Sequence, residues 1–233
     1  MKKIIISLAI ACIAILSATI GIYYSSSLQL ANLSYSGELM LAGSEAYLVS
    51  LTSSRSPLAA ETLANDYSNE RASGYIWQQD EYYHVIHSAF EKENDAILVK
   101  QTLGFGEIIK VQFNPSKIEI ELSQQKMSAL NQAHSVFMIA FRTMTDSWVG
   151  KETGVYTDVE ISNKLKKLSS KVETAIDEFW QEFSNESNNR IVELGEYLAD
   201  LSECIALCQK DNKPKFHAVE ILHIFKNLTC ELN

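Results

Sequence analysis

The chain begins with one long apolar run. No charged residue occurs from Ile4 to Ile22, and a helix of this length rises about 28 Å, close to the hydrocarbon thickness of a bilayer. Two lysines precede the run and two tyrosines follow it. Because Lys favours the cytoplasmic side and Tyr favours the membrane interface, residues 1–24 are predicted to form a single-pass anchor with the N-terminus inside.

Two alternatives to an uncleaved anchor stay open. The first is a cleaved signal peptide, whose apolar region usually spans about 7–15 residues. This run is longer, and residues 16–18 imitate a cleavage site poorly. The second is lipidation at Cys12, since residues 9–12 vaguely resemble a lipobox, although apolar sequence continues well past them. The anchor is favoured, and it places the rest of the chain outside a bacterial cytoplasmic membrane.

The exported part starts with short segments of alternating polarity. Residues 25–44 have no clear period and are predicted to be a linker. Strands are predicted at 47–51, 74–77, 82–87 and 107–113, the last extended through 118–122, and helices at 57–69 and 91–103. The succession is strand, helix, strand, strand, helix, strand. This is the order of a ferredoxin-like βαββαβ unit, which is expected to span residues 45–122.

The hydrophobic period changes after Ser123 from two to about 3.5 residues. Apolar positions recur at alternating spacings of three and four through residues 127–148, and Gly150 is predicted to end this helix. Similar stretches follow at 161–183, 191–208 and 214–225. Four amphipathic segments with short connections predict an antiparallel four-helix bundle over residues 123–233. The fold class is therefore α+β, with an anchor, a ferredoxin-like unit and a bundle.

One stretch of the α+β unit resembles a known family. Residues 83–90 read Y-H-V-I-H-S-A-F and are followed by Ala96. They resemble the third strand and second helix of the SPOR (sporulation-related repeat) domain, whose pattern is roughly Y-R-V-x-x-G-P-F. Residues 47–53 look like the opening motif of that family. The resemblance covers residues 45–113 and implies an open sheet face that binds peptidoglycan glycan strands lacking their peptide stems.

The resemblance also implies which residues would contact the glycan. Successive side chains of a strand alternate between the two faces of its sheet. The family pattern sends Val85 into the core under the two helices. The opposite face would then be exposed and would carry the glycan-binding residues, which are Ser50, Thr52, Trp77, His84, Ile86 and Ser88. The sequence departs from the family at four of the sheet positions, with His84 for Arg, Ser88 for Gly, Ala89 for Pro and Ser50 for Gln.

Charge and reactive residues narrow the function further. The net charge is −9, and Lys and Arg do not form a cluster. This excludes nucleic acid as a partner, because binding to it depends on clustered basic side chains that release counterions from the phosphates. Cys204 and Cys208 are expected to be buried thiols, as no C-x-x-C pair occurs. His217 and His223 lie six residues apart and would occupy different faces of a helix, so no metal site is expected from them. We find no nucleophile motif and expect neither an enzyme nor a cofactor.

Two functions follow as hypotheses. The first is a non-enzymatic, membrane-anchored protein that binds peptidoglycan glycan strands during envelope remodelling, division or sporulation. The alternative is a protein-interaction scaffold of an envelope complex without glycan binding, with a protein partner on the helical bundle or on a sheet edge.

Overall fold

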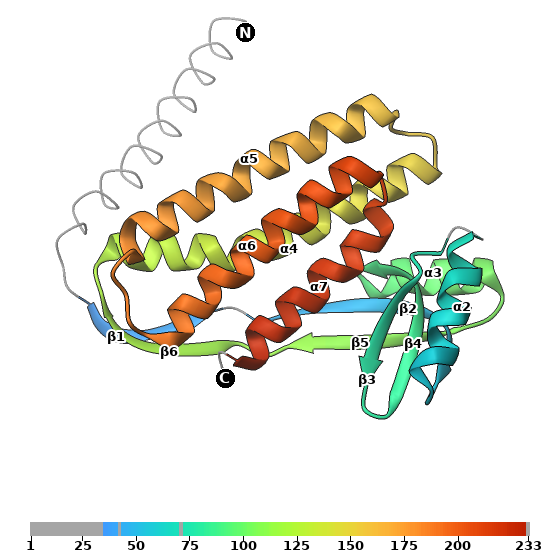
Figure 1. Ribbon diagram of the computed structural model, residues 1–233, viewed down its shortest axis with the longest axis horizontal. Helices are drawn as coiled ribbons and strands as arrows, with labels where there is room; N and C mark the ends of the chain where they lie inside the picture. The colour runs from blue at the N-terminus through green and yellow to red at the C-terminus, as the bar shows by residue number, and fades with distance from the viewer. Residues whose placement is uncertain (1–34, 42, 70–71, 232–233) are drawn as a thin grey trace, which may run out of the picture.

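The computed structural model of the protein describes residues 35–41, 43–69 and 72–231 (Figure 1). The predicted anchor at residues 4–22 lies outside these ranges. Within them, no helix is both long enough and apolar enough to cross a membrane.

The elements follow one another as six strands and six helices in the described part of the chain. In order they are β1 (Tyr35–Leu41), β2 (Ser44–Ser54), α2 (Pro57–Asn69), β3 (Tyr75–Gln79), β4 (Tyr82–Phe90), α3 (Glu93–Leu103), β5 (Glu107–Phe113), β6 (Ser116–Leu122), α4 (Gln124–Glu152), α5 (Asp158–Phe183), α6 (Asn189–Asp211) and α7 (Pro214–Glu231). Strands β2 to β5 form an antiparallel sheet in the order β3-β4-β2-β5. The predicted βαββαβ succession and the helical bundle after it are confirmed.

The first and last strands form a separate two-stranded ribbon. Strand β1 pairs antiparallel with β6, with Tyr35 opposite Leu122. The predicted linker at 25–44 is therefore wrong from Tyr35 onward, and β6 is a strand of its own rather than an extension of β5. The break has a steric cause: a Cβ at Gly43 would lie 2.6 Å from the carbonyl oxygen of Phe113 and 2.9 Å from the nitrogen of Pro115. The proline has no N–H for the ladder, so regular pairing stops there.

The bundle helices match the predicted segments except at one boundary. Helix α4 does not end at Gly150 but continues to Glu152. A Cβ at Gly150 would lie 2.0 Å from Cδ2 of Tyr156, so the glycine lets this ring pack against the helix. The residue thus serves close packing and is not a stop signal.

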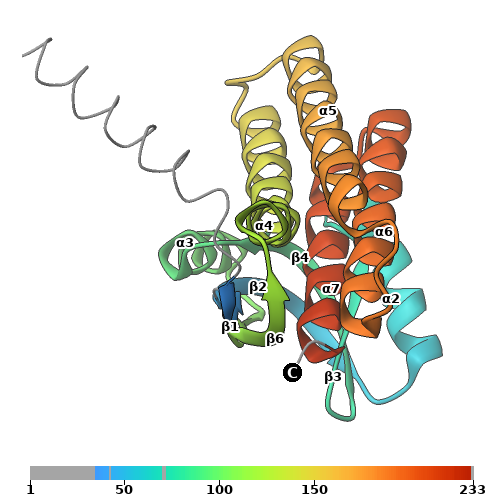
Figure 2. The ribbon, with the colours of Figure 1, turned by 90° about the vertical axis from the view of Figure 1, so that its left-hand side faces the viewer.

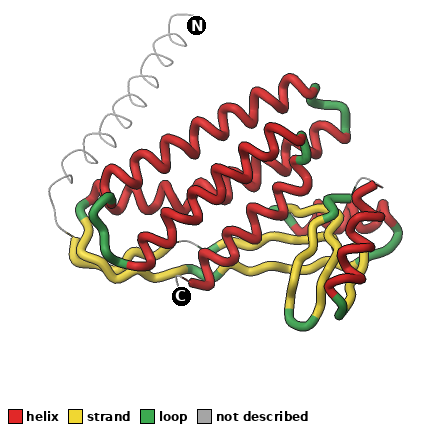
Figure 3. Tube along the Cα trace, in the orientation of Figure 1, coloured by secondary structure: helices red, strands yellow, loops and turns green. Residues whose placement is uncertain are grey.

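The sheet and the bundle share one hydrophobic core. Figures 2 and 3 show the four bundle helices lying along one side of the strands. The ring of Phe225 on α7 lies 4.9 Å from that of Phe113 on β5 and 5.5 Å from that of Phe137 on α4. Helix α2 belongs to a separate small cluster in which Ala60 and Ala64 pack with Val85, as predicted for the Val85 side. One face of the sheet is therefore covered by α7 and α4.

Candidate functional site

The six residues expected to bind glycan do not form an exposed face. Ser50, Ile86 and Ser88 are fully buried, and Trp77 is 1% exposed. Thr52 and His84 are partly exposed, and Nδ1 of His84 lies 3.1 Å from Oε1 of Glu107. The prediction that this face is open is wrong.

Helix α7 covers the side of the sheet where Trp77 and Ile86 lie. An irregularity in β2 between Ser50 and Thr52 pairs Thr52 with Val85, on the opposite side. The ring of His223 meets that of Trp77 edge-on at 5.6 Å, and Nζ of Lys226 lies 4.8 Å from the centre of the Trp77 ring. Tyr75 on β3 similarly packs on Phe216 at 5.2 Å. Large aromatic side chains contribute much apolar area, so their burial under α7 is favourable. The alternation of β3 and β4 does not reveal this, because the covering helix comes well over a hundred residues later in the chain.

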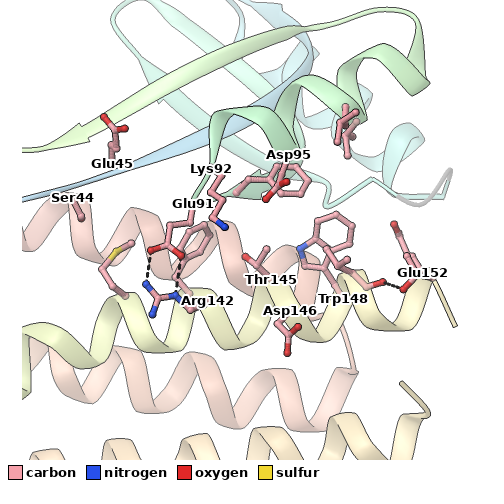
Figure 4. Close-up of a pocket in the computed structure, with 17 residues that line it drawn as sticks. Ser44, Glu45, Glu91, Lys92, Asp95, Arg142, Thr145, Asp146, Trp148 and Glu152 are labelled. Carbon is pink, nitrogen blue, oxygen red and sulfur yellow. Dashed lines mark hydrogen bonds and ion pairs between the residues drawn. The ribbon is translucent and has the colours of Figure 1, made fainter. Parts of the chain in front are cut away.

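A groove with a volume of about 1160 Å³ lies between α3 and α4 (Figure 4). Its walls combine an apolar floor with a charged rim. The floor consists of Phe90, Leu98, Val99, Met138, Phe141, Trp148 and Val149, and the rim includes Glu45, Glu91, Lys92, Asp95, Arg142, Asp146 and Glu152. The rim therefore carries more acidic than basic side chains.

Ion pairs fix much of this rim. Arg142 donates to both carboxylate oxygens of Glu91, from Nε at 2.9 Å and from a terminal nitrogen, as Figure 4 shows. This pairing lowers the pKa of Glu91. Lys215 Nζ donates to Glu152 Oε1 at 2.6 Å. The rim charges are thus held in place beside the apolar floor.

Two polar groups lining the groove have no hydrogen-bond partner in the described structure. They are Nε1 of Trp148 and Oγ of Ser44. Trp148 is 5% exposed, and its ring lies 5.4 Å from that of Phe90. In Figure 4 the indole nitrogen faces along the groove toward Thr145. A buried N–H without an acceptor is costly. Both atoms are almost completely shielded from solvent, so a ligand in the groove could reach them only if the surrounding side chains moved.

A second polar cluster lies where α6 turns into α7. Asn212 adopts the left-handed conformation with φ of 54° and ends α6, and Pro214 begins α7. This tight connection brings one turn of each helix together. The side chains that meet there are Cys204, Cys208 and Asp211 from α6, and His217 and Glu220 from α7.

The distances within this cluster are short. Nδ1 of His217 lies 2.7 Å from Oε2 of Glu220 and 3.6 Å from Sγ of Cys204. The same thiol donates to Oε2 of Glu220 at 3.2 Å. The other ring nitrogen of His217, Nε2, lies 3.1 Å from Oδ2 of Asp211. Cys204 and His217 are 3% and 2% exposed, so water is largely excluded.

The environment sets the protonation of these groups. Burial, reinforced by Glu220, raises the pKa of the Cys204 thiol, and burial raises the pKa of Cys208 to about 12. Burial opposes a charge on His217, but its hydrogen bonds to Glu220 and Asp211 outweigh this and raise its pKa. The hydrogen bond from His217 lowers the pKa of Glu220. The cluster therefore places an imidazole with a raised pKa between the carboxyl groups of Asp211 and Glu220, beside two thiols whose pKa values are raised.

The expectation that Cys204 and Cys208 are buried is confirmed. The sequence did not predict that Asp211, His217 and Glu220 lie beside these thiols. His217 and His223 do point to different surroundings, since His223 packs on Trp77. The sequence signal for the cluster is a Cys pair four residues apart and a His-Glu pair three residues apart, on consecutive helices joined by a tight turn.

No protein-family model matches this chain, and no curated protein or solved structure matches it either.

Proposed function

We propose that this chain is a membrane-anchored, non-enzymatic interaction module that binds a segment of an envelope protein in the groove between α3 and α4. The observation that carries the proposal is the groove itself, which joins an apolar floor to a charged rim. The anchor at residues 4–22 and the extracytoplasmic location belong to the proposal and rest on the sequence pattern.

The size and composition of the groove favour a protein segment over a small molecule. Its volume of about 1160 Å³ exceeds the range of about 300 to 1,000 Å³ that is usual for small-ligand pockets. An apolar centre with a polar rim is the arrangement of protein interfaces. Leu98 on the floor is 62% exposed, which provides apolar area for a partner.

The net charge of the chain favours a basic partner. Four of the five acidic side chains on the rim are already paired with basic side chains, namely Glu45 with Lys110, Glu91 with Arg142, Asp146 with Lys164 and Glu152 with Lys215, but the chain as a whole has a net charge of −9. Complementary charge steers association and disfavours wrong partners. The proposed ligand is therefore an amphipathic segment that carries Lys or Arg beside its apolar residues.

Glycan binding by a SPOR-like, ferredoxin-like unit is the competing proposal. The βαββαβ order and the strand order β3-β4-β2-β5 support a ferredoxin-like arrangement. However, Ser50, Trp77, Ile86 and Ser88 would contact glycan only if α7 left the sheet. Such a movement would uncover the large apolar side chains of the shared core, which disfavours this function.

Site-specific cross-linking in intact cells tests the two proposals. A photoreactive residue at Asp95 on the rim should form a discrete product with one envelope protein, whereas the same residue at Val159, 70% exposed on α5, should not. Leu98→Lys should weaken that product at least tenfold by placing a charge on the apolar floor. The identified partner should then bind the purified full-length chain, again only without Leu98→Lys.

Two results would reject the groove as the binding site. One is equal cross-linking from Asp95 and Val159, and the other is an Asp95 product that Leu98→Lys leaves unchanged. Co-sedimentation of the full-length chain with stem-stripped peptidoglycan, lost on Trp77→Ala but not on Leu98→Lys, would favour glycan binding instead.

A further inference from the structure

We propose that Cys204, His217 and Glu220 bind a zinc ion at the turn between α6 and α7, with Asp211 orienting the imidazole. This inference is independent of the groove and of what the groove binds. It assigns a role to a cluster that the interaction function does not use.

The ligand atoms already lie near the corners of a coordination site. In tetrahedral zinc, with bonds of about 2.3 Å to sulfur and about 2.0–2.1 Å to nitrogen or oxygen, neighbouring ligand atoms are about 3.3–3.6 Å apart. Here Sγ of Cys204 lies 3.6 Å from Nδ1 of His217 and 3.2 Å from Oε2 of Glu220. The pair formed by Nδ1 and Oε2, at 2.7 Å, has to widen by about 0.6 Å, and the pair formed by Sγ and Oε2 by about 0.3 Å.

The chemistry of the donors selects among metals. One thiolate, one imidazole and one carboxylate are ligands that zinc accepts together. Calcium and magnesium prefer oxygen ligands throughout, so this mixed set disfavours them. The thiol of Cys208 belongs to a separate group with Asp211 and His217, and the proposed site does not use it.

The outer contact of His217 is also that of a metal ligand. Histidines bound to metals usually donate their second ring N–H to a carboxylate or a carbonyl, which fixes the tautomer and the ring orientation. Nε2 of His217 lies 3.1 Å from Oδ2 of Asp211, leaving Nδ1 directed at Cys204 and Glu220.

Zinc replaces two protons of the cluster when it binds. Zn²⁺ displaces the proton from the Cys204 thiol and the proton from Nδ1 of His217, and both protons leave to solvent. The new bonds run from zinc to the thiolate sulfur, to Nδ1 and to the Glu220 carboxylate. The ion with one thiolate and one carboxylate has no net charge, which suits a site from which water is largely excluded.

The position of the site gives the metal a structural role. It joins the last turns of α6 to the first turns of α7, beside the contact between Tyr75 and Phe216 that holds α7 on β3. Zinc bound here would fix the start of the helix that covers the sheet.

Cobalt(II) titration of the reduced full-length chain in detergent tests the proposal. Thiolate-to-cobalt charge-transfer absorption should saturate at one equivalent and should be bleached by zinc. Cys204→Ser should abolish this band. His134→Phe, which alters a buried histidine outside the cluster, should retain it. Asp211→Asn should weaken binding about 10- to 100-fold, as expected for a residue that orients a ligand.

Two further measurements keep the test decisive if Cys204→Ser folds poorly. Glu220→Gln keeps both thiols and should still lose at least tenfold in affinity for cobalt. Zinc should raise the Tm of the wild-type chain and of His134→Phe, but not that of Cys204→Ser. The proposal is overturned by a wild-type chain without a thiolate band, or by titrations of Cys204→Ser and Glu220→Gln that match the wild type. The cluster would then be a hydrogen-bonded ion pair without metal.

Discussion

Buried histidines behave differently in this molecule according to whether they have carboxylate partners. His217, between Asp211 and Glu220, has a raised pKa despite its burial. His134, packed 5.1 Å from the ring of Phe225, has a pKa lowered to about 4 by burial. Burial and the charge of Lys215 likewise lower the pKa of His87 to about 4. Burial and the charge of Lys226 also lower the pKa of His223. These three histidines should make the protein sensitive to acid.

We predict that His134→Phe reduces this sensitivity. The unfolded chain takes up a proton near the ordinary histidine pKa of about 6.5, before the folded chain does. The contribution of neutral His134 is therefore present above pH 6.5 and is lost as the pH falls toward 4, by on the order of 2–3 kcal/mol. Urea unfolding of the full chain at pH 7.5 and pH 4.5 should show a smaller pH difference in the variant, because His134 no longer contributes, whereas His87 and His223 still do. An unchanged difference would contradict this prediction.

At the scale of the elements, local signals define the helix starts. Helix α5 begins with a capping box, in which Thr157 Oγ1 accepts from the N–H of Glu160 at 3.3 Å, and Glu160 Oε2 accepts from the N–H of Thr157 at 2.8 Å. Ser123 caps α4 in a similar way, accepting from the N–H of Lys126 at 3.2 Å. Such contacts satisfy N–H groups that have no partner within the helix.

Thr157→Ala should therefore destabilise the protein by about 1 kcal/mol, because the capping contacts are lost. The matched control is Thr174→Ala on the exposed middle of the same helix, where alanine is the better helix former and the change should be close to zero or stabilising. Urea midpoints of the two variants measure the difference. Equal destabilisation by both substitutions would contradict the role of the cap.

The elements that the sequence predicts well are those whose pattern is local. The change of the hydrophobic period after Ser123 predicts the bundle, because the spacing of apolar residues within one helix indicates which face of that helix is buried. Strand β1 has no such signal, because its partner β6 lies about eighty residues later. The same limit applies to the candidate site. Strand alternation correctly separates Val85 from Ile86, but only the position of α7 decides that the Ile86 side is buried.

At the scale of the whole molecule, the strands and the bundle should unfold together. Phe225 is fully buried and contacts Phe113 of the sheet, Phe137 of α4 and His134. It belongs to one continuous cluster that includes residues of β2, β4, β5 and all four bundle helices. Neither part can lose this contact without exposing apolar surface of the other.

Phe225→Ala should cost about 3–5 kcal/mol, as large-to-small changes in a core do. The transitions followed by helical circular dichroism and by tryptophan fluorescence should coincide before and after the substitution. Leu207→Ala, at a side chain 43% exposed on α6, is the control and should change stability by less than about 1 kcal/mol. Two separated transitions, with only one shifted by Phe225→Ala, would show that the sheet and bundle are independent.

The β1–β6 ribbon determines how the molecule would respond to mechanical force. Tyr35 pairs with Leu122, so the N-terminal end of β1 lies beside the point where the chain enters α4. A pull on the chain before Tyr35, against a load borne by the bundle, acts on both strands at the same end. The pairs would then open one after another, from Tyr35–Leu122 toward Leu41–Ser116, rather than shear all at once. The ribbon can thus lengthen under modest tension while the shared core remains intact.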